Sequence, residues 1–389
     1  MKCRLSSLKL VLLLVVSLVS LSAQAAELSS LPERSAAIRT VIEKSRELIR
    51  AKQEEWKIPG VSAAVAVDGR VVWSEGFGWA DLEQRIAVSP LTRLRIGSVS
   101  KMFAAVAVAA LVEQGRLDLD APIQRYVPYF PEKRWPITAR QLAGHMAGIR
   151  HYADKDAAFV DLNFDSVVYA GPLSGAPHFA SVRDGLAIFE DDPLEFEPGT
   201  KSQYSSYGFN LLSTVVEGAA GESYLDAVNR LVTEPLGLLA TGADHPYYII
   251  PNRSRFYRQS KSEGTLNAPF IDSSYKWAGG GFLSTPEDLV RFASALLQPG
   301  FLRAETLELM FTPQRLANGE SIGVGIGWRV DRDEQGRRRF HHGGTIEGGG
   351  AIILGLRDEK VAVAIVTNQL PRFGNDEAGR IAAWFAEAP

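Results

Sequence analysis

The chain has 389 residues, 46% of them hydrophobic and 22% charged, which is an ordinary globular composition with enough apolar material for a large core. Its 42 basic and 45 acidic residues leave a formal net charge of −3, so no basic excess points to nucleic acid or to anionic lipid. We therefore expect small or neutral partners. The length favours two domains, or one large domain with an insertion.

The N-terminus, residues 1–25, has the pattern of a secretory signal peptide. Three basic residues within the first nine precede a short apolar run over 10–21, and Ala-Gln-Ala at 23–25 supplies a small-x-small cleavage site. The run is shorter than a comfortable membrane span. We predict cleavage and a secreted or periplasmic mature chain with no stable membrane span; an uncleaved anchor is the alternative.

The only cysteine, Cys3, lies ahead of this apolar run and would be lost on cleavage. Its loss would remove disulfides, thiol catalysis and cysteine-ligated metal from the mature chain.

The next segment predicts a helix followed by a β-hairpin. Apolar residues recur at helical spacing over 35–56, and Pro59-Gly60 ends that helix. Two β-rich runs, 61–67 and 70–77, flank Asp68-Gly69, which is a strong signal for a two-residue hairpin turn.

Helical patterns dominate the middle of the chain, and strands return near its end. Thr285, followed by Pro286 and two acidic residues, is a helix start. The predicted middle helices cover 99–113, 210–220 and 224–232, with long loops over 152–200 and 240–275. The predicted late elements are strands over 337–341, 349–356 and 361–368 and a closing helix over 376–385.

This order of elements predicts an α/β (α+β) fold. One antiparallel sheet would be built from both ends of the chain and flanked by terminal and central helices, with an inserted, mostly helical lobe packed against it. We predict that 26–97 and 275–389 form the sheet domain and that 98–274 form the helical lobe. The candidate site would lie in the groove between them.

Ser98 and Lys101 form the first candidate cluster. Ser98 falls where an apolar helix begins, and Lys101, three residues on, shares its helical face. A serine hydroxyl needs a neighbouring base to act as a nucleophile, and desolvation can lower the pKa of a lysine enough for it to serve. Residues 102–112 are apolar on every face, which predicts a buried helix. A capping serine beside a snorkelling lysine is the structural alternative, since Ser-x-x-Lys also occurs at 6–9 and 273–276.

Tyr204 and Ser206 form the second cluster. A phenol beside an ammonium ionises more readily and can shuttle a proton. The hydroxyl two residues later can hydrogen-bond the lysine. A half-buried tyrosine that only packs is the alternative.

The third cluster is His341-His342-Gly343-Gly344. A histidine on a strand edge can donate to substrate, and the glycines let a substrate backbone approach closely. The N–H of Gly344 can pair with that of Ser98 as an oxyanion hole. A strand followed by a glycine-rich turn is the structural alternative. A zinc site is disfavoured, because adjacent strand residues point to opposite faces and the other histidines have no ligand spacing.

Taken together, the three clusters resemble the superfamily of class C β-lactamases, D-alanyl-D-alanine peptidases and related esterases. In that superfamily Ser-x-x-Lys is followed by Tyr-x-Ser or Tyr-x-Asn and then by Lys- or His-x-Gly on a late strand. The likeness covers nearly the whole mature chain. The stretches 144–152 and 203–208 look more narrowly like the serine β-lactamase-like proteins, whose animal member is mitochondrial.

The resemblance implies a role for each matching residue. Ser98 would be the acylated nucleophile, with Lys101 and Tyr204 as the proton-transfer pair, and which of the two takes the serine proton stays open. Ser206 would hold the third position of the tyrosine motif. His341 would replace the lysine of typical β-lactamases.

In the same comparison His342 would be the variable residue, and Gly343 and Gly344 would line the strand edge. Histidine is mostly neutral near pH 7 whereas lysine is a permanent charge, so the replacement favours a peptidase or esterase over an efficient β-lactamase. Serine in place of the commoner asparagine at 206 likewise favours a peptidase or esterase over an efficient β-lactamase. We expect a structural role for His145 and His151.

The sequence therefore predicts acyl transfer to water at an amide or ester carbonyl, through a Ser98 acyl-enzyme and without a cofactor or metal. Muropeptides, other peptides and small esters are the candidate substrates. A binding or assembly module on the same fold is the alternative, since the narrower family implies self-assembly. A zinc hydrolase is the third hypothesis.

Overall fold

The computed structural model describes residues 36–156 and 178–388. The predicted signal peptide and residues 157–177 of the first predicted long loop lie outside the described residues. Within the described ranges, none of the helices combines the length and the apolar character that a membrane span requires.

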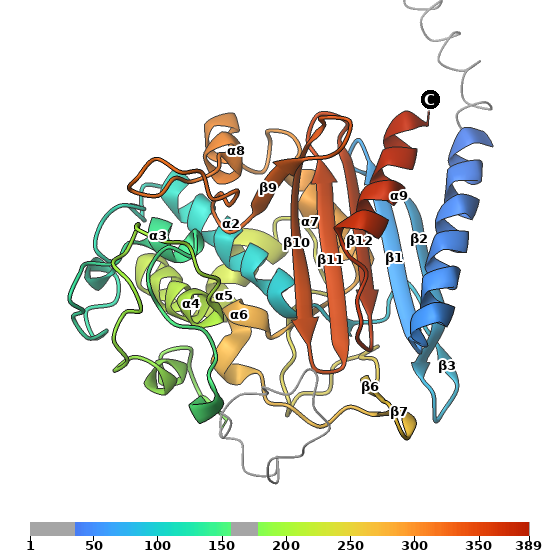
Figure 1. Cartoon of the computed structure of the whole chain (residues 1–389), viewed down its shortest axis with the longest axis horizontal. Coiled ribbons are helices and arrows are strands. Elements are labelled where there is room, and N and C mark those ends of the chain that lie inside the picture. Colours follow the sequence, from blue (N-terminus) through green and yellow to red (C-terminus); the bar gives the residue numbers. More distant parts are fainter. Residues whose placement is uncertain (1–35, 157–177, 389) are drawn as a thin grey trace, which may run out of the picture.

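A seven-stranded antiparallel sheet forms the centre of the molecule (Figure 1), and it is assembled from both ends of the chain as predicted. In spatial order its strands are β3 (Ile86–Ala87), β2 (Arg70–Asp81), β1 (Gly60–Val67), β12 (Val361–Thr367), β11 (Gly349–Leu356), β10 (Arg338–Ile346) and β9 (Arg329–Arg332). β1 and β12, which lie about 300 positions apart in sequence, pair at the middle of the sheet, with Val61 opposite Thr367.

The predicted turn between β1 and β2 is present. Asp68 and Gly69 have φ angles of 50° and 78°, the left-handed conformation that a two-residue hairpin of this kind needs at both positions. This turn fixes the register in which Val67 lies opposite Arg70.

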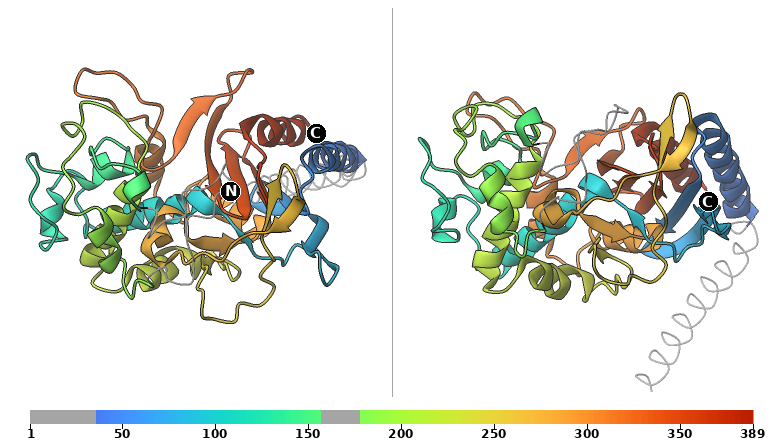
Figure 2. Two further views of the ribbon diagram at one scale, coloured as in Figure 1. Left: turned by 60° about the horizontal axis from the view of Figure 1, so that its bottom comes forward. Right: turned by 90° about the horizontal axis from the view of Figure 1, so that it is seen from below.

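Two helices cover one face of the sheet: a first helix over 36–56 and α9 (Asn375–Glu387). They lie side by side on that face in Figures 1 and 2. Their apolar residues, such as Ile49, Ile381 and Phe385, form one buried cluster with Trp73 and Ile352 of the sheet. The terminal helices are therefore held by burial of apolar surface.

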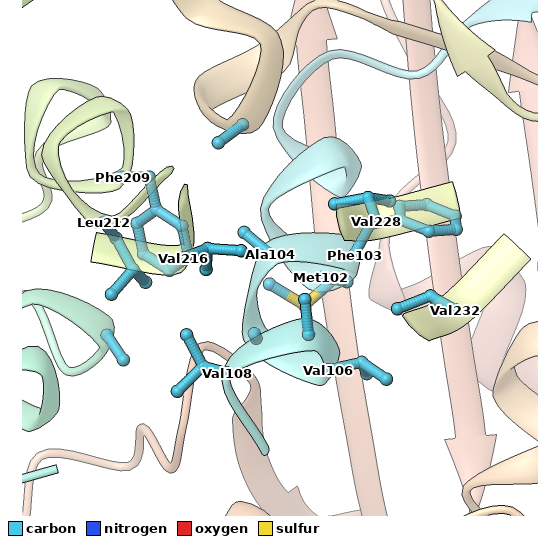
Figure 3. Close-up of a cluster of buried hydrophobic side chains, with 14 of the residues drawn as sticks. Met102, Phe103, Ala104, Val106, Val108, Phe209, Leu212, Val216, Val228 and Val232 are labelled. Carbon is cyan, nitrogen blue, oxygen red and sulfur yellow. The ribbon is translucent and has the colours of Figure 1, made fainter. Parts of the chain in front are cut away.

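The opposite face of the sheet packs against α7 (Pro286–Ala295), α2 (Ser100–Glu113) and the helical lobe. α7 begins as predicted, with the Thr285 hydroxyl accepting a hydrogen bond from the N–H of Asp288 at 3.2 Å. α2 is apolar all round and buried along almost its whole length. Figure 3 shows Val216 of α4 on one side of α2 and Val232 on the other.

The remaining helices are short or belong to the helical lobe: α3 (Ala139–Ala143), α4 (Ser206–Ala220), α5 (Tyr224–Val228), α6 (Trp277–Gly280) and α8 (Ala304–Phe311). Small β elements complete the fold: β4 (Leu94–Arg95) and β5 (Gly242–Ala243) on either side of β8 (Phe282–Ser284), and the hairpin of β6 (Tyr257–Ser260) with β7 (Gly264–Asn267). β5, β6 and β7 lie in the stretch 240–275 that was predicted to be a loop.

Two element boundaries differ from the prediction, and both bear on the site. α4 starts at Ser206 instead of Asn210, because the Ser205 hydroxyl caps it by accepting the N–H of Gly208 at 2.9 Å. β10 continues past His341 to Ile346, because β11 pairs with it along this whole length. The glycines of the third cluster are therefore strand residues and do not form a turn.

The largest apolar core runs without a break from the helical lobe onto the sheet. It joins Phe103 of α2 and Phe209 of α4 with Ile353 of β11 and Ala364 of β12. The predicted domain boundaries at 97/98 and 274/275 stay a prediction, while this core shows that the two regions pack as one unit.

Candidate active site

Ser98 and Lys101 meet where the sequence predicted, at the start of the buried helix. Ser98 lies in a short 3₁₀ turn, Gly97–Val99, that leads directly into α2. Its side chain is half-buried, whereas Lys101 is completely buried. The Nζ atom of Lys101 lies 3.1 Å from the Oγ atom of Ser98, within hydrogen-bonding distance.

The Lys101 amine has two further partners. Nζ lies 3.0 Å from the hydroxyl of Ser206 and 2.5 Å from the carbonyl oxygen of Gly279. Burial lowers the pKa of this amine below its usual value. A neutral amine has two N–H donors and one lone pair. Donation to Gly279 and Ser206 would leave the lone pair for the Ser98 hydroxyl proton.

Tyr204 lies against the same amine, one residue before the Ser205 cap of α4. The Nζ atom of Lys101 lies 4.9 Å from the centre of the Tyr204 ring. Burial alone would raise the pKa of the phenol, but the Lys101 charge and the hydroxyls of Ser98 and Ser206 outweigh it, so the pKa is lowered. Lys101 and Tyr204 therefore both lie beside Ser98 with lowered pKa values.

Two histidines hold the backbone that follows Tyr204. The Nδ1 atoms of His145 and His151 accept hydrogen bonds from the N–H groups of Ser205 and Ser206, both at 3.2 Å. Burial and the nearby Lys101 charge lower both pKa values, to about 4 for His151. Both rings are therefore neutral near pH 7 and carry their proton on Nε2. These contacts agree with the structural role predicted for the two residues.

The position of the late histidine must be corrected by one residue. The sequence analysis placed His341 in the site and treated His342 as variable, but His342 lines the site. Adjacent residues on β10 point to opposite faces. His341 is turned away, with Nε2 at 3.3 Å from Asp331 and 3.4 Å from the Asn375 amide. His342 faces Tyr204, with ring centres 6.4 Å apart.

His342 is neutral and its tautomer is fixed. Its Nδ1 lies 2.8 Å from the carbonyl oxygen of Gly343, which can only accept, so Nδ1 carries the proton. Burial and the charge of Lys101 lower the pKa of His342 well below its usual value. The ring therefore presents an unprotonated Nε2.

The two predicted glycines have different positions. Gly343 lines the cavity, but Gly344 packs against the backbone that precedes Ser98. A Cβ atom on Gly344 would lie 1.9 Å from the carbonyl oxygen of Ile96 and 3.1 Å from the nitrogen of Ser98. On the other side of this contact, a Cβ on Gly97 would lie 2.7 Å from the nitrogen of Thr345. Glycine at both positions lets β10 approach the start of α2.

These groups surround a cavity of about 350 Å³. Of the predicted residues, Ser98, Tyr204, Ser206 and Gly343 line it, with Lys101 directly behind them. The lining also contains His151, Lys276, Arg329, His342 and Arg372. Neither arginine lies near a motif, so the sequence carried no local signal for them. Among the described residues, no Asp or Glu lines this cavity.

Within 36–156 and 178–388, no three histidine, cysteine, aspartate or glutamate side chains are grouped so that they could hold a metal ion. The imidazoles near Tyr204 instead use one nitrogen each on backbone groups.

The fold, together with a serine and a buried lysine one helical turn apart, defines a protein of the β-lactamase and penicillin-binding-protein fold. The chain belongs to the Beta-lactamase family, whose family model matches residues 46–387. This result confirms the predicted family and fold class, and membership of the family supports a hydrolase.

Individual relatives agree with this assignment. The chain is 32% identical to the human mitochondrial serine beta-lactamase-like protein LACTB over 421 residues, covering 88% of this chain and 77% of that protein. The octameric penicillin-binding protein homologue from Pyrococcus abyssi is similar with a TM-score of 0.71 and 26% identity, covering 88% and 76% of the two chains. A D-stereospecific amidohydrolase from Streptomyces gives a TM-score of 0.69 and 25% identity, covering 89% and 97%.

Proposed function

We propose that this chain is a serine hydrolase that forms an acyl-enzyme on Ser98 from an amide or ester and then releases the acyl group to water. The observation that carries the proposal is the completely buried Lys101 amine, 3.1 Å from Ser98 Oγ and anchored by Ser206 and Gly279. A serine hydroxyl beside a buried amine of lowered pKa is a nucleophile with its base in place.

The proposed reaction has two balanced halves. Ser98 Oγ attacks the carbonyl carbon while its proton passes to the Lys101–Tyr204 pair, and a tetrahedral oxyanion forms. Collapse of this intermediate breaks the bond to the leaving group, which takes the proton from the same pair. A water molecule then repeats the sequence on the acyl-enzyme and restores the serine hydroxyl. The lowered pKa values of both groups support either one as the acceptor.

The oxyanion is proposed to lie at the start of α2. The backbone N–H of Ser98 would be one donor. The second would come from β10 where it lies against Gly97, at Gly344 or Thr345. The close contact between β10 and the turn at Gly97 supports this placement, because two backbone donors must lie within about 3 Å of one oxygen.

The neutral charge of His342 favours one class of substrate over another. Typical β-lactamases have a lysine at the corresponding position, and lysine is a permanent charge, whereas His342 is neutral with Nε2 free to accept a proton. We therefore propose a peptidase or esterase, with β-lactam hydrolysis at most weak. The amidohydrolase and penicillin-binding relatives support amide substrates.

Export and self-assembly belong to the same proposal. The signal-like pattern of residues 1–25 supports a secreted or periplasmic chain. Assembly into a symmetric oligomer is proposed because the Pyrococcus abyssi homologue is octameric.

The nucleophile can be tested by covalent labelling. A fluorophosphonate probe should label the wild-type protein, Ser98→Ala should abolish labelling, and Ser223→Ala, a helix-capping serine outside the cavity, should be labelled like wild type. Equal labelling of the Ser98→Ala protein would remove the assignment. A fluorescent penicillin used in parallel should label far more weakly than the fluorophosphonate if His342 disfavours β-lactams.

A further inference from the structure

A second cavity, separate from the one that contains Ser98, is formed by β4, the residues after β5 and the two ends of the β6–β7 hairpin. Its volume is about 430 Å³, and among the described residues none lines both cavities. Arg95, Arg253 and Arg255 line it, and Asp244 is the one carboxylate that the described residues contribute to its lining. A lining with this excess of positive charge favours a ligand of negative charge.

Asp244 balances only one of the arginines that it contacts. Its Oδ2 accepts a hydrogen bond from Nε of Arg95 at 2.7 Å, and its Oδ1 accepts one from Nη1 of Arg253 at 3.1 Å. The third arginine, Arg255, is exposed and lies 3.7 Å from Asp81, so it adds little to the pairing. One carboxylate therefore faces two guanidinium groups, and one positive charge beside the cavity is left without a counter-charge.

The Arg95 guanidinium is held rigidly in the cavity wall. Its side chain is only 6% exposed and lies 3.9 Å over the centre of the Phe256 ring. Its Nη1 donates to the carbonyl oxygen of Glu347 at 3.0 Å. These contacts and the bond to Asp244 fix the plane of the fork, and they leave Nη2 without a hydrogen-bond partner among the described residues. A donor that is already oriented binds an anion at a low cost in side-chain entropy.

Arg253 presents a second set of donors on the other side of Asp244. Its Nη1 also donates to the carbonyl oxygen of His245 at 3.2 Å, which orients the group. Its Nε and Nη2 have no partner in the described part of the chain. A guanidinium fork matches the oxygens of a carboxylate, phosphate or phosphonate.

An aromatic wall completes the cavity. Phe270 lines it and is 58% exposed, which is high for a large apolar side chain. Phe256 lies beneath Arg95 and also lines the cavity. An apolar ring placed against Phe270 would remove exposed aromatic surface from water.

We propose that this cavity is a binding site for a small organic anion, with the charged oxygens on Arg95 and Arg253 and an apolar ring against Phe270. The ligand is distinct from the substrate of Ser98, because the two cavities have no lining residue in common among the described residues. The inference therefore does not rest on the proposed serine chemistry.

Isothermal titration calorimetry with phenylphosphonate tests the site. Two matched probes separate its parts, since methylphosphonate keeps the anion without the ring and benzyl alcohol keeps the ring without the anion. Phenylphosphonate should bind at one site per chain and about tenfold or more tighter than either probe. A charge-assisted hydrogen bond and the burial of a ring are each large enough to give a factor of this size.

Arg253→Gln should weaken the binding of phenylphosphonate about tenfold, since it removes one charged contact. Phe270→Ala should weaken phenylphosphonate and leave methylphosphonate unchanged, because only the former has a ring. The control is Arg329→Gln, which changes an exposed arginine of the Ser98 cavity and should keep the wild-type affinity. If Arg253→Gln fails to fold, Phe270→Ala still gives the test, because its side chain is exposed.

Three results would overturn the inference. The first is phenylphosphonate binding no tighter than benzyl alcohol. The second is wild-type affinity in both Arg253→Gln and Phe270→Ala. The third is weakening by Arg329→Gln with no effect of Arg253→Gln, which would place the anion in the Ser98 cavity. None of these readouts depends on turnover, so failure of the proposed function would produce none of them.

Discussion

Replacing the buried amine tests the centre of the proposed mechanism. Lys101→Met keeps the length and the apolar stem of the side chain but removes the group that lies 3.1 Å from Ser98. Loss of a positioned acid–base group costs about 10²- to 10⁴-fold in rate, or roughly 3–5 kcal/mol in the barrier. We expect kcat/KM for a p-nitrophenyl ester to fall by this factor, with Ser98 labelling slowed in proportion.

The same variant has a predictable effect on stability. Since the pKa of Lys101 is lowered in the folded protein, the unfolded chain binds more protons between that lowered value and about 10.4. The stability of the wild type should therefore rise with pH across this window by up to about 1.4 kcal/mol per pH unit. The lowered pKa of Tyr204 acts in the same direction. Lys101→Met should lose this slope.

Urea unfolding from pH 7 to 10 measures the slope, and initial rates measure the activity. The matched control is Lys133→Met, because Lys133 is also held by backbone carbonyls, of Glu190 and Asp192, but lies away from the cavity. It should lose stability and keep its turnover. An unchanged rate in Lys101→Met would refute the assignment of the amine. An unchanged pH slope would refute the lowered pKa.

Further outcomes follow from the other contacts. His342→Ala should lower kcat/KM about tenfold or more, the size of a lost hydrogen bond, whereas His341→Ala should leave kcat/KM within a few-fold of wild type. The reverse result would show that His341, as first predicted from the sequence, is the histidine of the site. Because the pKa of His151 is lowered to about 4, stability should fall as the pH drops from about 6.5 to 4, and chemical unfolding should show this fall reduced in His151→Gln. Gly344→Ala should destabilise the fold by about 1–3 kcal/mol or more, seen as a lower midpoint in thermal unfolding, and should slow Ser98 labelling. Dialysis against a strong chelator should leave the initial rate unchanged, and a loss that added zinc restores would favour the zinc hydrolase.

The first half of the site could be predicted because its signals are local. Ser98 and Lys101 share a helical face, and three residues of separation suffice to bring them together. The apolar run after Lys101 also predicts its burial. That Tyr204 and Ser206 approach this helix across more than 100 positions followed only from the family resemblance, since nothing in the spacing specifies it.

Which histidine of β10 faces the site could not be predicted from the sequence. His341-His342-Gly343-Gly344 fits a His-x-Gly pattern from either histidine, and the two alignments differ by one residue. On a strand, one residue decides which face a side chain occupies. Only the tertiary structure shows which face of β10 meets α2. The place of Arg372 in the cavity lining was similarly hidden, because it depends on a guanidinium from the segment between β12 and α9 lying over Gly343 of β10.

The unbroken apolar packing beneath Ser98 has a mechanical consequence. Side chains of α2, α4, β11 and β12 belong to a single buried cluster, so prising the helical lobe from the sheet would expose apolar surface at about 25 cal/mol per Å². We therefore expect the helical lobe and the sheet to resist moving apart beneath the nucleophile. Substitutions of the residues that line the cavity should accordingly be able to change specificity without disturbing the apolar scaffold below.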